Sequence, residues 1–146
     1  MFKHIHIFGT SSNYQKITKI FVDAPMQYID ACLQDNIYVP EHDGTFLITT
    51  SITNDYKKLS LKSLKGDNIK IELTKYAWEP SLFDIHITLS KTNAAITIAE
   101  AIIVMENLLE FQDFGINMQV YNQDKIFYGN PLDIMIALQC LHKLER

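Results

Sequence analysis

The chain of 146 residues contains only two cysteines and a single arginine. A secreted domain that depends on disulfides would be expected to carry more cysteines than Cys32 and Cys140. Both lie in apolar stretches with helical spacing, so we expect reduced, buried thiols. Arg146 is the only arginine, and arginine is the side chain best suited to bind bases and phosphates through paired hydrogen bonds. Its scarcity therefore argues against nucleic-acid binding.

Glycine and proline are also scarce, with five and four residues respectively. This scarcity, with 47% hydrophobic and 21% charged residues, argues against a disordered chain. No apolar run approaches the length of a membrane span, and the first residues lack the pattern of a signal peptide. We therefore expect residues 1–146 to form one globular domain, soluble in the cytoplasm and not bound to a membrane.

Alternation of apolar and polar residues predicts most of the strands. Residues 69–75 show it most clearly, because Ile69, Ile71 and Leu73 alternate with polar side chains. Residues 9–13 read as a turn, and the β-branched residues after them favour a second strand. The predicted strands cover residues 2–8, 15–22, 46–53, 59–64, 69–75, 83–89, 117–121 and 125–128.

Apolar residues at helical spacing predict three helices, at residues 25–35, 93–111 and 131–144. The last has the clearest start, with Asn130 as N-cap and Pro131 in the first position. Its predicted core-facing residues are Leu132, Met135, Ile136, Gln139 and Leu141. The predicted fold class is α+β: a mostly antiparallel sheet, with a meander of four or more strands, and about three helices packed on one face.

The five histidines are the most evident chemical groups. His4 and His6 share one face of the first predicted strand, as a pair of metal ligands would, but a further ligand such as His86 or His42 must come from the fold. Motifs of serine hydrolases, phosphate-binding loops and zinc proteases are missing. We therefore expect no metal and no cofactor, and we lean against an enzyme.

His86-Ile87-Thr88 resembles one half of the active site of the 2H phosphoesterase family. In that family, two His-x-Thr pairs on neighbouring strands bind a phosphate and act as general acid and base. His4-Ile5-His6 lies upstream as the second pair, although His6 stands where the family has Thr or Ser. The resemblance implies a small phosphoesterase with His86, Thr88, His4 and His6 as its catalytic residues.

Charge is distributed unevenly along the chain. Residues 21–56 contain six acidic residues and no lysine or arginine, whereas residues 57–75 contain six lysines, which favour a solvated sheet edge. Acidic groups interleaved with tyrosine suit docking onto a basic protein, since complementary charge speeds association and tyrosine supplies anchors. The predicted partner-binding residues are Asp30, Asp35, Tyr38, Glu41 and Asp43.

These observations favour a small bacterial protein-binding module of the immunity type. Such a protein neutralises a toxin by covering its active site, and the expected partner is a protein with a basic surface. Two alternatives stay open. One is the phosphoesterase implied by the histidine pairs, and the other is a structural homodimer, since the helix predicted at residues 93–111 is apolar over a wide arc.

Overall fold

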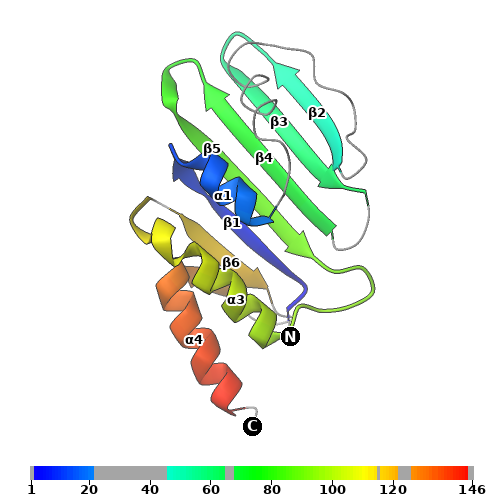
Figure 1. The fold of residues 1–146 in the computed structure, drawn as a ribbon, viewed down its shortest axis with the longest axis vertical. Helices are drawn as coiled ribbons and strands as arrows, with labels where there is room; N and C mark the ends of the chain where they lie inside the picture. Colours follow the sequence, from blue (N-terminus) through cyan, green and yellow to red (C-terminus); the bar gives the residue numbers. More distant parts are fainter. Residues whose placement is uncertain (1, 22–45, 65–67, 115, 122–125, 145–146) are drawn as a thin grey trace.

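The computed structural model of the chain describes residues 2–21, 46–64, 68–114, 116–121 and 126–144. Three α-helices and one 3-10 helix accompany seven strands in this part of the chain (Figure 1). The strands are β1 (His4–Ser11), β2 (Phe46–Ile52), β3 (Tyr56–Ser63), β4 (Asn68–Tyr76), β5 (Glu79–Ser90), β6 (Asn117–Tyr121) and β7 (Ile126–Gly129). The helices are α1 (Tyr14–Phe21), α3 (Ile98–Leu108), the 3-10 helix η1 (Leu109–Phe114) and α4 (Pro131–Leu144).

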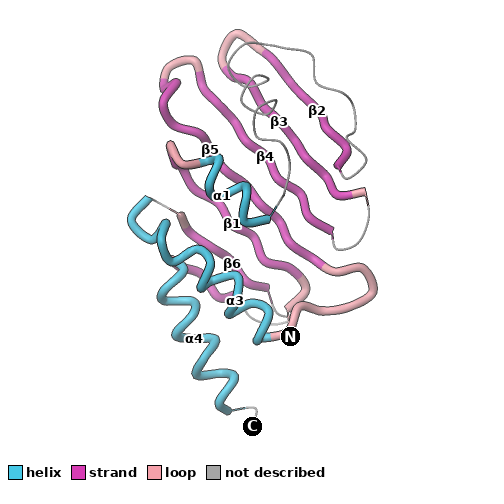
Figure 2. Tube along the Cα trace, viewed as in Figure 1, coloured by secondary structure: helices cyan, strands magenta, loops and turns pink. Residues whose placement is uncertain are grey.

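All seven strands form one antiparallel sheet in the order β2-β3-β4-β5-β1-β6-β7. The run from β2 to β5 is the predicted meander, and helices α1, α3 and α4 lie over one face of the sheet (Figures 1 and 2). The predicted α+β class is therefore confirmed. Strand β1 lies between β5 and β6, so that Ile7 is opposite Ile87 on one side and Met118 on the other.

Side chains alternate across each strand, which separates the core from the other face of the sheet. The buried core residues of the strands face the helices, and each of them is apolar and at most 5% exposed. They include Ile5, Ile7, Phe46, Ile48, Leu59, Leu61, Ile71, Leu73, Phe83, Ile85, Ile87, Met118 and Val120. Helix α3 adds Ile98, Ala101, Met105 and Leu108 to this core, and α4 adds Pro131, Ile134 and Leu138.

The strand predicted at residues 15–22 is wrong, because Tyr14–Phe21 forms helix α1. Tyr14, Ile17 and Thr18 are buried, and their spacing is that of one helix face. The helix starts where the backbone N–H of Ile17 donates to the carbonyl of Asn13 at 3.2 Å. The β-branched residues of this segment favour a strand locally, but burial of one helical face outweighs that preference. The turn predicted at residues 9–13 is also partly wrong, since β1 continues through Ser11.

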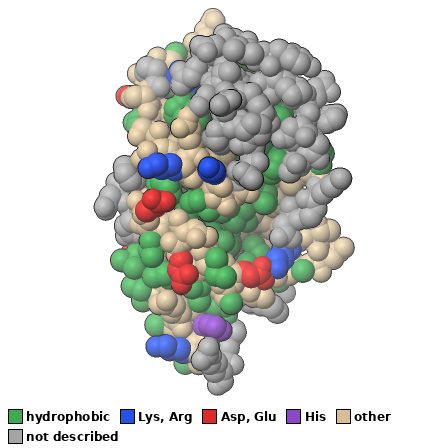
Figure 3. Space-filling view, in the orientation of Figure 1, with side chains coloured by type: hydrophobic (Ala, Val, Ile, Leu, Met, Phe, Trp, Pro, Cys, Tyr) green, Lys and Arg blue, Asp and Glu red, His purple; other side chains and the backbone are tan. Residues whose placement is uncertain are grey.

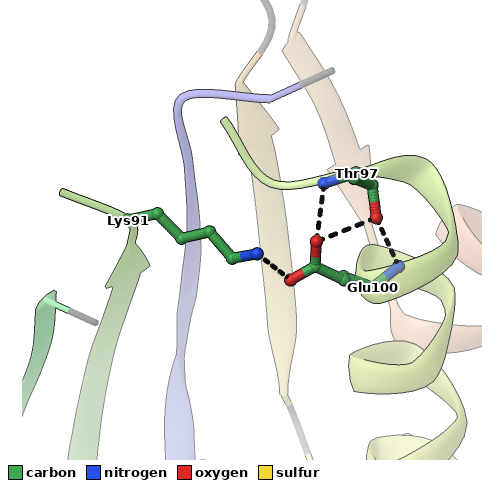
Figure 4. Close-up of polar contacts among 3 residues, drawn as sticks. All are labelled: Lys91, Thr97 and Glu100. Carbon is green, nitrogen blue, oxygen red and sulfur yellow. Dashed lines mark hydrogen bonds and ion pairs between the residues drawn. The ribbon is translucent and has the colours of Figure 1, made fainter. Parts of the chain in front are cut away.

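The helix predicted at residues 93–111 begins later, because α3 starts at Ile98 and η1 extends it to Phe114. Thr97 forms a capping box with Glu100 (Figure 4). The Thr97 hydroxyl accepts a hydrogen bond from the Glu100 N–H at 3.1 Å, and the Glu100 carboxylate accepts one from the Thr97 N–H at 3.4 Å. The same carboxylate forms an ion pair with Lys91, at the end of β5. These contacts fix where the helix begins.

Replacing Thr97 with alanine should lower the free energy of unfolding by about 1 kcal/mol, because the N-terminal N–H groups of α3 lose their acceptor. Replacing Asn107, which is exposed in the same helix, should change it by less than about 0.5 kcal/mol. Urea denaturation followed by circular dichroism measures both values. Equal stability of the two variants would contradict the role of the capping box.

Helix α4 has the predicted bounds, but the predicted core-facing stripe is partly wrong. Pro131, Ile134 and Leu138 are the buried residues, whereas Leu132 and Ile136 are 40% and 50% exposed. Hydrophobic side chains gather over the helices on the face of the molecule shown in Figure 3.

Cys140 is a free thiol, and it is exposed, which contradicts its predicted burial. It lies two positions after Leu138, and a turn of 200° carries it away from the buried stripe at about 100° per residue. Cys32 and the helix predicted at residues 25–35 lie outside the described residues. None of the helices in the described ranges is long and apolar enough to cross a membrane.

Candidate functional site

The sheet has a second face, on which no described helix packs. We call this the open face. Its side chains are those that alternate with the buried core residues. They include His4, His6 and Phe8 of β1, Lys58 and Lys62 of β3, Lys70 and Glu72 of β4, Asp84, His86 and Thr88 of β5, Gln119 and Tyr121 of β6, and Ile126 and Tyr128 of β7.

Two histidines from neighbouring strands meet at the centre of this face. His6 Nε2 lies 3.3 Å from His86 Nδ1, and their ring centroids are 5.4 Å apart. In the antiparallel register His6 is opposite Thr88, which places Thr88 on the adjacent strand beside this pair. His4 is on the same face, but its ring packs on Tyr121 with centroids 4.4 Å apart. The fold thus brings His6, His86 and Thr88 together, whereas His4, the fourth residue of the two tripeptides' predicted site, lies beside Tyr121.

Aromatic rings extend from this pair across the open face. Phe8 lies 5.3 Å from His6 and 6.0 Å from Tyr128, measured between ring centroids. Tyr128 and Ile126 of β7 are each 61% exposed. The open face therefore presents a continuous group of rings, from the histidines to β7, at its solvent surface.

The environment of His6 favours its neutral form. Partial burial lowers the pKa of His6, and the positive charges that His86 and His4 carry when protonated lower it further. The negative charge of Glu72 opposes this shift. The net effect is a pKa below the ordinary value, so the His6 ring is mostly neutral at pH 7 and offers a lone pair.

Strands β3 and β4 add a line of charges beside the histidines. Glu72 forms ion pairs with Lys58 at 2.7 Å and with Lys70 at 2.8 Å. Partial burial by itself would raise the pKa of Glu72, but hydrogen bonds from both lysines outweigh it and lower this pKa to about 2. The two strands lie inside the sheet, with β2 beyond them, so the lysines do not mark the sheet edge that the sequence predicts.

Replacing Glu72 with glutamine should lower the free energy of unfolding by about 1 kcal/mol at neutral pH. The pKa of Glu72 is lower in the folded chain than its ordinary value of 4.5, so the ionised form stabilises the fold. This stabilisation is present above about pH 4.5 and is lost as the pH falls from there towards 2. Thermal melts of both proteins from pH 7 to pH 2 should converge at low pH. A constant difference would contradict the prediction.

A second aromatic group lies at the end of the β4–β5 hairpin. Trp78 is 68% exposed and stacks on Tyr76, with ring centroids 4.7 Å apart. The Tyr56 ring meets that of Tyr76 edge-on, with centroids 6.4 Å apart. A hydrogen bond to the Asp84 carboxylate raises the pKa of Tyr76. The sequence interpretation missed this group, although an exposed tryptophan beside a hairpin turn is a recognisable signal for binding.

Asp30, Asp35, Tyr38, Glu41 and Asp43, predicted to bind the partner, lie outside the described residues. In the part of the chain that the structure covers, no group of three or more histidine, cysteine or acidic side chains could hold a metal ion.

On the helix side, a cavity of about 230 Å³ lies between α1, α3 and the sheet. Apolar side chains such as Ile20, Leu89 and Val104 line it, with the ion pair of Lys91 and Glu100 in its wall. Ile103 is 54% exposed, in keeping with the apolar arc noted for this helix. The homodimer suggested by that arc stays a prediction.

No family model matches the chain, and neither a curated protein sequence nor a solved structure shows significant similarity to it.

Proposed function

We propose that this chain is a protein-binding module that uses the open face of its sheet as a docking surface. The observation that carries this proposal is the exposure of Tyr128 and Ile126 on the open face, each 61% exposed, and of Trp78, 68% exposed at the end of the β4–β5 hairpin. Tryptophan and tyrosine are the residues that most often anchor protein interfaces, because they bury a large area and keep a polar group for a hydrogen bond.

The polar groups around these rings suit the same role. The ion pairs of Glu72 with Lys58 and Lys70 give the open face both signs of charge beside its aromatic groups. Interfaces commonly combine an aromatic centre with a polar rim of this kind. Charged groups at such a rim determine which partner is accepted more than how tightly it is held.

The more specific form of the proposal is an immunity-type protein in the bacterial cytoplasm. In this role, the acidic residues Asp30, Asp35, Glu41 and Asp43, with Tyr38 among them, face the basic active cleft of a toxin and block it. Sequence composition supports this form, since residues 21–56 carry six acidic side chains and no lysine or arginine.

Affinity capture from the native host, with mass spectrometry of the co-purified proteins, tests the proposal. We expect a partner with a basic surface, whose association slows as salt is added because charges are screened over about 8 Å at 0.15 M. Replacing Tyr128 or Trp78 with alanine should speed dissociation, and replacing Asp35 and Glu41 with lysine should slow association.

Leu144→Ala is the matched control, since Leu144 is 84% exposed at the far end of α4 and should leave both rates unchanged. If Tyr128→Ala and Trp78→Ala bind the captured partner as the unchanged chain does, the open face is not the docking surface. If the Asp35 and Glu41 substitutions have no effect on association, the acidic stretch is not part of it. The open face and the acidic stretch are therefore tested separately.

A second candidate function rests on the histidine pair. The contact of His6 with His86, with Thr88 opposite His6 in the register, places two histidine-bearing tripeptides on neighbouring strands. His6 stands where the 2H phosphoesterase family has Thr or Ser, and His4, at the family's histidine position, packs on Tyr121, so the proposal uses His6 as the second histidine. Such an arrangement supports the phosphoesterase alternative, in which one histidine acts as general base and the other as general acid. Cleavage of a cyclic phosphoester tests it, and the expected result is developed in the Discussion.

A further inference from the structure

The two nitrogens that face each other across β1 and β5 are separated by a distance typical of shared metal coordination. Zinc binds imidazole nitrogen at about 2.0–2.1 Å, and with tetrahedral angles two such nitrogens are about 3.3–3.4 Å apart. His6 Nε2 and His86 Nδ1 are 3.3 Å apart. The two rings share a hydrogen bond at this distance, which a bound metal ion would replace.

We propose that His6 and His86 together bind one divalent transition-metal ion on the open face. They supply two imidazole ligands, and water or a group from a bound partner occupies the other coordination positions. Imidazole suits zinc, copper and nickel, whereas magnesium and calcium prefer oxygen ligands.

The strands hold both ligands firmly. Strand β1 pairs with β5 and β6, and β5 pairs with β1 and β4, so neither histidine lies on an edge strand. The Phe8 ring lies 5.3 Å from His6 and 6.3 Å from His86, between centroids, and packs against both. Ligands on rigid, packed strands lose little freedom on binding, which favours a site with few protein ligands.

His4 is the natural comparison because it is on the same strand and the same face. Its ring is 4.4 Å from that of Tyr121, between centroids, and the site as proposed does not include it. His4→Gln should therefore bind zinc as the unchanged chain does. This variant separates a specific site from general attraction of metal ions to a face rich in histidine.

Titration with Zn²⁺ alone, followed by calorimetry and by the imidazole nitrogen signals in NMR spectra, tests the inference. The unchanged chain should bind one zinc ion with saturation, and the signals of His6 and His86 should shift together. His6→Gln and His86→Gln should each weaken binding by about 10–100-fold or more, since even residues that only support a metal ligand contribute that much. Circular dichroism of the metal-free variants checks that they keep the fold.

Absence of saturable binding by the unchanged chain would overturn the proposal. So would zinc affinity that survives in the double variant of His6 and His86, or that is lost in His4→Gln. Thr88→Val separates this inference from the phosphoesterase alternative, because Thr88 would contact a phosphate and is not a metal ligand here. Zinc binding that is unchanged in Thr88→Val supports the metal site whether or not a phosphoester is cleaved.

Discussion

Replacing Ile7 with alanine should lower the free energy of unfolding by about 2–5 kcal/mol. Ile7 is fully buried in β1, where it lies opposite Ile87 and Met118, which are also fully buried. Removing its side chain leaves a cavity between two strand pairs that cannot close without moving the centre of the sheet. This loss is a large fraction of the stability of an ordinary domain.

Chemical denaturation followed by fluorescence of Trp78 measures this change. Thr10→Ala is the control in the same strand, because Thr10 is exposed and makes only a surface hydrogen bond to Asp84. We expect that variant to stay within about 0.5 kcal/mol of the unchanged chain. A loss below about 1 kcal/mol in Ile7→Ala would mean that β1 is not at the centre of the core.

Replacing His86 with alanine should reduce the cleavage of a cyclic phosphoester by about 10²–10⁴-fold if the second candidate function is correct. The reason is that His86 lies 3.3 Å from His6, so its loss removes one of the two groups that would exchange protons with the substrate. Thr88→Val should weaken substrate binding because a hydrogen bond to the phosphate is removed.

His142→Ala is the matched control, since His142 lies in the last turn of α4 and on another part of the fold. Its rate should equal that of the unchanged chain. Cleavage that persists at an equal rate in His86→Ala would come from a contaminant or from another site. In either case His86 and Thr88 would be removed from the mechanism.

The sequence predicts the position of a helix or strand well where one of its faces is buried and the other is exposed to solvent. Alternation at Ile69, Ile71 and Leu73 is strict, and β4 is found where expected. The same holds for α4, whose start at Asn130 and Pro131 depends on local chemistry that needs no knowledge of the rest of the fold.

The errors arise where local preference and packing disagree. Ile17, Thr18 and Ile20 are β-branched, yet they lie in a helix because the fold buries one helical face there. Cys140 lies in an apolar run, but only the three-dimensional arrangement decides which side of α4 meets the sheet. Composition alone does not reveal which side of α4 faces the sheet.

The geometry of the candidate site also depends on tertiary structure that local sequence patterns do not predict. Periodicity places His4 and His6 on one strand face, and His86 with Thr88 on another. Whether these strands are neighbours, and in which register, depends on pairings between distant parts of the chain, which no local pattern encodes. The contact between His6 and His86 is therefore a result of the topology.

The central place of β1 also has a consequence for how the chain reaches its native state. Strand β1 is made before its partners β5 and β6, which follow far later in the chain. Until they emerge from the ribosome, the buried side chains of Ile5 and Ile7 have no strand to pair with on either side. Such non-local pairing slows folding, so we expect the last cooperative step to wait for β6 and to be much slower than in a helical protein of this size.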